Sequence, residues 1–180
     1  MGNYTELAFQ TAREINPQAT LILNDNLNET PSRPFFESDL KIINNLKEKG
    51  LVDGIGMHMH LDGSKDIDVE SLIKGMQAYG VPVYITELDV DMRRVNLNDP
   101  QRLEKQAEIY RKVMHACLVS GVCKLFGTWN TGDAYSWLED PNGGGSALLP
   151  GSSKNADPTM FFDDLSPKLA FFAVMAEMVK

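Results

Sequence analysis

Apolar residues along the chain follow two alternating periods, one typical of helices and one typical of strands. Spacings of three and four residues predict helices over 6–15, 35–50, 68–80, 99–121 and 166–180. Between them, short runs rich in β-branched and aromatic residues predict strands over 19–24, 52–61, 81–88 and 123–130. Strands that alternate with helices run parallel and are joined by right-handed crossovers. The pattern therefore predicts an α/β fold with four parallel strands and five helices.

Polar and aromatic residues gather where the four predicted strands end. These ends carry Asn24-Asp25, His58-Met59-His60, Glu87-Leu88-Asp89 and Trp129-Asn130, with Asp133 and Trp137 just beyond. In parallel α/β folds the chemistry collects at the carboxyl ends of the strands. Carboxylates can act as acid, base or nucleophile on a glycosidic bond, and indoles stack on the apolar faces of sugar rings. The strand ends therefore predict a sugar site.

The third strand runs directly into two acids. Val83 to Thr86 is a β-branched and aromatic run that indicates a buried strand, and Glu87 and Asp89 follow with only Leu88 between them. Side chains alternate along a strand, so the two carboxylates are expected on the same side. Asp89 could then orient an imidazole that in turn touches Glu87.

Composition narrows the class of partner. The chain has 180 residues, 43% of them hydrophobic, which is enough for one domain with a core. A net charge of −8 without a basic cluster argues against nucleic acid and against an anionic membrane surface. No apolar run approaches the length of a transmembrane helix, and the first ten residues lack the basic and apolar regions of a signal peptide.

Two cysteines, Cys117 and Cys123, bracket the turn between the fourth helix and the fourth strand. Their spacing fits neither a redox CxxC motif nor a zinc site, which needs further ligands. From the residues alone, a disulfide and a pair of buried thiols both stay open. We expect no metal and no cofactor.

Five stretches carry a resemblance to a known family. They are TELAFQTAREINPQATLILND, VDGIGMHMHL, VYITELDV, FGTWNTGDAYSW and LSPKLAFFAV. In this order, over nearly the whole chain, they resemble the C-terminal half of glycoside hydrolase family 10, the endo-β-1,4-xylanases, whose catalytic domain is a (β/α)8 TIM barrel. The resemblance implies that residues 1–180 form a partial catalytic domain with strands five to eight of that barrel.

The resemblance also implies roles for particular residues. Glu87 matches the catalytic nucleophile, His60 the histidine that hydrogen-bonds it, and Asp89 the acid linked to that histidine. The carboxylates are expected to raise the pKa of His60.

Further matches concern substrate binding and the cysteines. Asn24 matches the Asn of the family's Asn-Asp motif, and Trp129 and Trp137 resemble the tryptophans beside the cleaved bond. The cysteine pair resembles one that is often a disulfide in the family, which favours a bridge and an extracellular parent protein.

Departures from the family pattern stand at the same places. His58-Met59-His60 occupies the position of the usual Gln-Ser-His, so His58 puts an imidazole where an amide binds substrate. Asn26 stands where many members have Tyr, and Asn130 stands where Gly usually follows the tryptophan. The family's acid/base glutamate belongs to the fourth barrel strand, which would precede residue 1.

Two functions follow as hypotheses. The first is a retaining endo-β-1,4-xylanase acting on xylan or xylo-oligosaccharides, of which this chain carries the nucleophile half. The alternative is a catalytically inactive carbohydrate-binding or structural half-barrel. The inner face of the sheet is expected to expose apolar side chains, among them Leu21, Leu23, Val83 and Ile85, at about 1.5–3 kcal/mol each. This cost and the open sheet edges predict a homodimer or a complementing N-terminal half.

Overall fold

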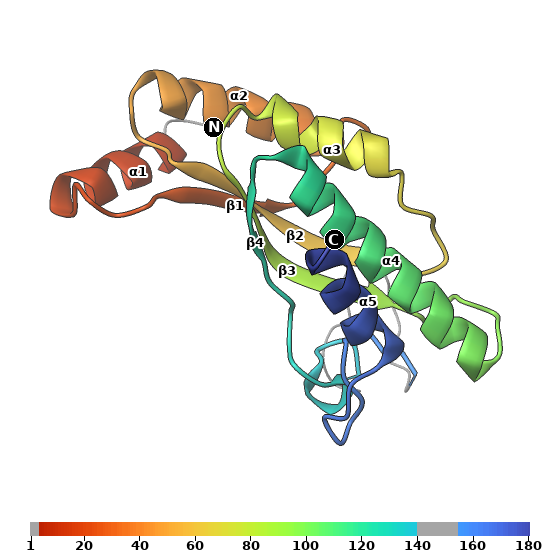
Figure 1. The fold of residues 1–180 in the computed structure, drawn as a ribbon. Helices are drawn as coiled ribbons and strands as arrows, with labels where there is room; N and C mark the ends of the chain where they lie inside the picture. The colour runs from red at the N-terminus through yellow and green to blue at the C-terminus, as the bar shows by residue number, and fades with distance from the viewer. Residues whose placement is uncertain (1–3, 140–154) are drawn as a thin grey trace.

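The computed structural model describes residues 4–139 and 155–180, and these form one sheet covered by helices (Figure 1). The elements are α1 (Tyr4–Ile15), β1 (Ile22–Asn26), α2 (Phe36–Glu48), β2 (Gly54–Asp62), α3 (Val69–Ala78), β3 (Val83–Asp91), α4 (Asp99–Ser120), β4 (Cys123–Phe126) and α5 (Leu169–Met178), with a short 3-10 helix, η1 (Asp133–Tyr135). The strands are parallel and lie in chain order, β1-β2-β3-β4. The predicted architecture of four parallel strands and five helices is confirmed for the described residues.

The sheet has one covered face and one open face. Helices α2, α3 and α4 lie along the covered face, and α5 packs beside α4 (Figure 1). The strands bury a continuous apolar set against these helices: Ile55, Met57, Met59, Leu61, Val83, Ile85 and Leu88. The core therefore lies between the sheet and the helices, and the opposite face remains free for a site.

The open face differs from the expectation that it would be apolar. Val83 and Ile85 are fully buried on the helix side, so the expectation that they face water is wrong. The open face carries Asn24 and Thr86, whose side chains are hydrogen-bonded across it, and Gly56, whose added Cβ would meet the Asn24 side chain. Successive side chains of a strand point to opposite faces of the sheet. The sequence pattern alone does not say whether the odd-numbered or the even-numbered positions face the helices.

Element boundaries follow the predicted ones within a few residues, and the last helix differs most. Ser166 followed by Pro167 predicts a cap and a first turn at the start of this helix. This prediction is wrong, because α5 begins at Leu169 with Lys168 at the N-cap. Phe161 forms a β-bridge with Pro167, and the amide of Phe162 donates to the carbonyl of Ser166, which holds this segment extended.

A disulfide joins Cys117, near the end of α4, to Cys123, the first residue of β4. It ties the edge strand of the sheet to the helix layer. The bridge that the family resemblance favoured is therefore present.

Two further expectations concern a long loop and membrane-spanning helices. The glycine-rich stretch over 139–164 predicts a long loop, and most of it lies outside the described residues, which resume at 155. No described helix is both long and apolar enough to cross a membrane.

Candidate active site around Glu87

A β-bulge sets the direction of the Glu87 side chain. In the pairing of β2 with β3, Met57 lies opposite Ile85 and His58 lies opposite Glu87, so Thr86 is the extra residue. A bulge lets two successive residues point to the same face. Thr86 and Glu87 accordingly both reach side chains of the open face.

Glu87 lies at the level where the four-stranded sheet narrows. The expectation that the third strand ends at this carboxylate needs correction, because β3 continues to Asp91. The neighbouring β1 ends opposite His58, and β4 ends opposite Ile85. Glu87 is therefore at the rim of the four-stranded part, from which β2 and β3 continue alone as a two-stranded ribbon.

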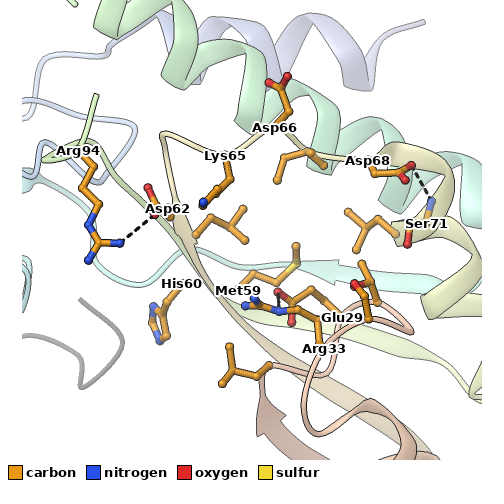
Figure 2. A pocket seen from close by; sticks show the side chains of 16 residues that line it. Glu29, Arg33, Met59, His60, Asp62, Lys65, Asp66, Asp68, Ser71 and Arg94 are labelled. Atoms are coloured by element: carbon orange, nitrogen blue, oxygen red, sulfur yellow. Dashed lines mark hydrogen bonds and ion pairs between the residues drawn. The ribbon is translucent and has the colours of Figure 1, made fainter. Parts of the chain in front are cut away.

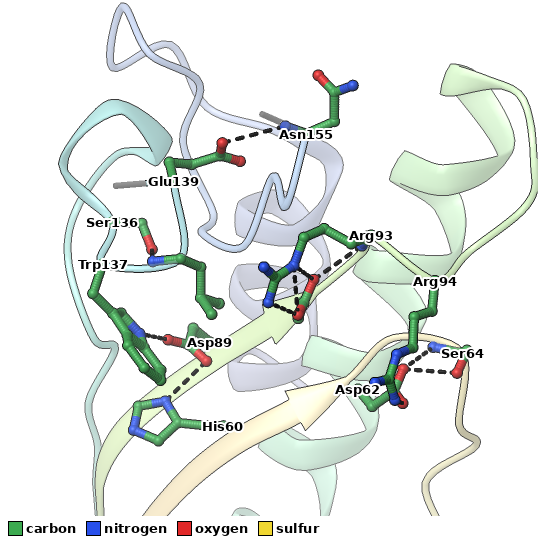
Figure 3. A network of polar contacts seen from close by, with 12 residues as sticks. His60, Asp62, Ser64, Asp89, Arg93, Arg94, Ser136, Trp137, Glu139 and Asn155 are labelled. Atoms are coloured by element: carbon green, nitrogen blue, oxygen red, sulfur yellow. Dashed lines mark hydrogen bonds and ion pairs between the residues drawn. The ribbon is translucent and has the colours of Figure 1, made fainter. Parts of the chain in front are cut away.

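An ordered chain of polar contacts holds the carboxylate. His60 Nε2 lies 3.1 Å from Glu87 Oε2. On the other side of the ring, His60 Nδ1 lies 2.9 Å from Asp89 Oδ1 (Figure 3). The expected hydrogen bond between His60 and Glu87, with Asp89 behind the imidazole, is present. Burial acts to lower the pKa of His60, but Asp89 and Glu87 outweigh it and raise the pKa above the usual value.

Trp137 completes this chain from the far side. Its indole Nε1 donates to Asp89 Oδ2 at 2.8 Å, and its ring centroid lies 5.0 Å from that of His60 (Figure 3). Asp89 is fully buried, and its two oxygens are bonded to His60 and to Trp137. Trp137 thus helps to position Asp89, a role that the family resemblance did not imply for it.

Trp129 presents its indole more openly. Its backbone amide donates to the carbonyl of Leu88 at 2.9 Å, which fixes the residue beside β3. Its side chain is 41% exposed and its ring centroid lies 6.4 Å from that of His60. The next residue, Asn130, has φ +84°, a left-handed conformation that Gly adopts freely and Asn tolerates. This accounts for the Gly in the family pattern.

His58 approaches Glu87 from the other side of His60. Its Nε2 lies 3.1 Å from Glu87 Oε1, an ion-pair contact, and this buried nitrogen has no hydrogen-bond partner among the described residues. The two imidazole centroids are 6.1 Å apart. Glu87 is therefore flanked by one imidazole at each carboxylate oxygen.

The two asparagines of β1 lie at different levels. Asn24 pairs with Gly56, below the rim, and its Oδ1 accepts a hydrogen bond from Thr86 Oγ1 at 2.9 Å. Asn26 pairs with His58 and so is level with Glu87, and its buried Oδ1 lacks a described partner. The register therefore adds Asn26 to the candidate substrate-binding residues. The sequence pointed to Asn26 only as a position where many family members have Tyr.

Asp133, also noted at the strand ends, does not belong to the site. It is buried and forms an ion pair with Lys168 at 2.5 Å, and its Oδ1 accepts hydrogen bonds from Thr159. Burial raises its pKa, and Lys168 opposes the shift. Its role is to tie the segment that carries Trp137 to the segment before α5.

A pocket of about 410 Å³ lies next to this cluster (Figure 2). Its walls come from the connection between β1 and α2, the end of β2 and the connection between β2 and α3. His60 and Asp62 contribute from β2, and Arg33, Lys65 and Arg94 add charge. Glu87 does not line this pocket, whereas its hydrogen-bond partner His60 does. The pocket therefore adjoins the carboxylate without enclosing it.

A carboxylate held between imidazoles, with indoles beside it at the carboxyl side of parallel strands, is a site of the kind found in carbohydrate-active α/β enzymes. The family model for glycosyl hydrolase family 10 matches residues 1–177. The chain belongs to this family.

Known relatives agree with this assignment. The chain is 35% identical to endo-1,4-beta-xylanase B of Thermotoga neapolitana over 179 residues, covering 95% of this chain and 47% of that protein. An endo-1,4-beta-xylanase of Agaricus bisporus is 31% identical over 150 residues, covering 82% of this chain and 44% of the relative.

Solved structures share the fold. Native xylanase 10B from Thermotoga maritima superposes with a TM-score of 0.82 at 29% identity, covering 98% of this chain and 52% of that one. Xylanase 10B from Thermotoga petrophila RKU-1, solved in complex with xylobiose, gives 0.81 at 29% identity and covers 98% and 51%. The chain thus spans about half the length of these barrel proteins, and its fold is half of a TIM barrel.

Proposed function

We propose that this chain is the nucleophile-bearing half of a retaining endo-β-1,4-xylanase, comprising strands five to eight of the catalytic barrel and acting on xylan. The observation that carries the proposal is Glu87, a rim carboxylate with an imidazole nitrogen 3.1 Å from each of its oxygens. Membership of glycosyl hydrolase family 10 and the xylobiose complex of a structural neighbour support the substrate class.

In this proposal Glu87 attacks the anomeric carbon as the glycosidic C–O bond breaks, and the acid/base group protonates the departing sugar oxygen. Water then hydrolyses the covalent glycosyl intermediate and frees Glu87. His60 holds the carboxylate in its attacking orientation, and Asp89 with Trp137 holds His60. Trp129 offers an exposed indole face for a xylose ring. His58 and Asn24 are assigned to hydroxyl binding, and Asn26, at the level of Glu87, joins them.

The retaining mechanism needs a second carboxyl group about 5–5.5 Å from the first. Asp89 does not fit this role, because it is fully buried and both oxygens are engaged by His60 and Trp137. We therefore assign the acid/base group to residues outside this stretch. The same observation favours the second candidate function, a half-barrel that binds xylo-oligosaccharides without hydrolysing them.

Exposed apolar side chains on both flanks of the sheet support a closing partner. None of the residues of α1, beside the β1 edge, is buried, and its Tyr4 and Ile15 are 81% and 79% exposed. On the β4 flank, Phe172 of α5 and Leu125 of β4 are 54% and 45% exposed. We propose that a second copy or a complementing N-terminal half covers these flanks.

We also propose an extracellular parent protein. The disulfide between Cys117 and Cys123 supports this location, since such bridges persist in oxidising compartments.

An activated inhibitor tests the nucleophile without requiring the missing acid. A dinitrophenyl 2-deoxy-2-fluoro-xylobioside carries a leaving group that departs unprotonated, so Glu87 alone should become labelled. We expect a mass increase of one fluoroxylobiosyl group, mapped by peptide mass spectrometry to the peptide that contains Glu87.

Two variants control the labelling. Glu87→Gln should abolish it while preserving the fold, since the two side chains are nearly the same size. Glu70→Gln, on the exposed surface of α3, should leave it unchanged. Labelling of another peptide would refute the assignment, and saturable binding of xylohexaose without any labelling would favour the binding half-barrel.

A further inference from the structure

The described residues contain a three-residue group in which two imidazoles and a carboxylate converge. His58, His60 and Glu87 each offer one atom, and these atoms all lie within 4.8 Å of one another. Two of the separations, from each Nε2 to the nearer Glu87 oxygen, are 3.1 Å. All three side chains are largely buried, with 25%, 18% and 15% exposed.

These separations match the distances between ligand atoms around a tetrahedrally coordinated metal ion. Zinc binds imidazole nitrogen and carboxylate oxygen at about 2.0–2.2 Å, which places neighbouring ligand atoms about 3.3 Å apart. Two edges of the triangle already have about this size, and the third, between the two imidazole nitrogens, is within 4.8 Å. Two histidines and one glutamate, with a fourth position left for water, form a ligand set that zinc accepts.

Asp89 supports one of the two imidazoles from behind. Asp89 Oδ1 engages His60 Nδ1 at 2.9 Å, which directs Nε2 toward Glu87 and the centre of the group. Trp137 Nε1 in turn holds Asp89 at 2.8 Å. A carboxylate behind a ligating histidine orients the ring and increases its basicity.

His58 supplies an independent reason to look for a ligand. Its Nε2 is buried and has no hydrogen-bond partner among the described residues, although a carboxylate oxygen lies 3.1 Å away. Buried polar atoms without partners are uncommon and call for an explanation. An ion placed between the imidazoles and the carboxylate would satisfy this atom.

We propose that His58, His60 and Glu87 form a binding site for one divalent transition-metal ion of the zinc class. Imidazole donors favour Zn²⁺, Co²⁺ and Ni²⁺ over Mg²⁺ and Ca²⁺, which prefer oxygen ligands. The bound ion occupies Glu87 and therefore excludes a sugar from that carboxylate. This last consequence rests on the proposed function, whereas the binding itself does not.

Titration calorimetry of the metal-free protein with Zn²⁺ at pH 7.5, without sugar, tests the proposal directly. We expect one saturable site, competition by Co²⁺ with a visible ligand-field band typical of four-coordination, and no response to Mg²⁺. Because no substrate is present, a failure of the glycosidase proposal leaves this result unaffected.

Three variants distinguish this site from surface binding. His58→Gln removes a ligand and should weaken Zn²⁺ binding at least about 100-fold. Asp89→Asn should weaken it about 10–100-fold, because Asp89 orients the ligating ring of His60. His115→Gln is the matched control, because His115 also contacts a carboxylate, Glu177 at 2.8 Å, but lies on the opposite, helical side. It should bind Zn²⁺ as the unmodified chain does.

Thermal unfolding of each metal-free variant checks that the fold is retained, and Glu87→Gln provides a second ligand variant that should also lose the site. The proposal is overturned if the unmodified chain shows no saturable site. It is also overturned if His58→Gln binds normally, or if His115→Gln removes the binding.

Discussion

The two faces of the sheet carry the same strands but follow different chemical rules. On the covered face, Ile55, Met57 and Ile85 are completely buried against helices of the same chain. On the open face, Gly56 leaves room for the Asn24 side chain, and Thr86 is hydrogen-bonded to it. The covered face is packed by apolar contacts, while the open face depends on polar contacts and on the absence of a Cβ.

This difference shows which face supplies most of the folding free energy of the half-barrel. Burial of apolar area supplies most of the favourable folding free energy, and on the covered face the strands pack a continuous apolar set against the helices. The open face can therefore hold charged and polar groups such as Glu87 without undermining the fold. The comparison makes predictions that separate the two faces.

The largest effect is expected from a pair of adjacent residues on β3. Ile85→Ala creates a cavity in the covered face and should lower the free energy of unfolding by about 2–5 kcal/mol. Thr86→Ala, one residue further on the open face, removes hydrogen bonds to Asn24 and to the Met57 carbonyl and should cost about 1 kcal/mol. Urea denaturation of both variants measures the contrast, and equal losses would contradict it.

A buried acid makes the helical side sensitive to pH. Asp39 on α2 is 2% exposed, and burial raises its pKa to about 6, with the Asn28 hydrogen bond opposing the shift. The native state then holds this proton to higher pH than the unfolded state does, so stability is full below about pH 4 and falls as pH rises through 6. The loss at pH 7 should approach about 3 kcal/mol.

Asp39→Asn should remove this part of the pH dependence. The difference in unfolding free energy between the variant and the unmodified chain should grow from near zero at pH 4 to its full value at pH 7. Glu37→Gln, on the exposed side of the same helix, serves as the control and should give a flat difference. A difference for Asp39→Asn that does not change with pH would refute the buried-acid explanation.

The smallest expected effect tests the glycine of the open face. A Cβ on Gly56 would lie 2.1 Å from Asn24 Oδ1, so Gly56→Ala should destabilise by about 1–3 kcal/mol through overpacking. In an Asn24→Ala background much of this cost should disappear, because the clashing atoms are removed. Thermal unfolding of the two single variants and the double variant gives the coupling energy, and strict additivity would show that the two residues do not meet.

Much of the fold could be predicted from local patterns. Helical and strand periods placed every described long helix and every described strand near its observed position. Gly50, the last residue of the helix predicted over 35–50, has φ +67°, as is typical of a glycine that ends a helix. The start of α5 could not be predicted, because the cap signal of Ser166 and Pro167 competes with a bridge to Phe161. A contact between distant segments outweighed a local preference there.

The candidate site was predicted in part. Strand ends in a parallel fold meet at one edge, so Glu87, His60 and Asp89 could be grouped before any contact was known. Asp133 satisfied the same rule, yet it pairs with Lys168 in the interior. Asn26 was passed over as a candidate, because its level relative to Glu87 depends on strand register, which the sequence does not encode locally.

By itself the sequence determined the alternation of helices and strands, the parallel sheet, the family and the acids that follow the third strand. These rest on periodicity and on motifs of neighbouring residues. Only the tertiary structure decided which face of the sheet the helices cover, and only it placed the bulge at Thr86 that turns Glu87 toward His58 and His60. Both depend on register and packing between strands, where a shift of one residue exchanges the faces without altering the local pattern.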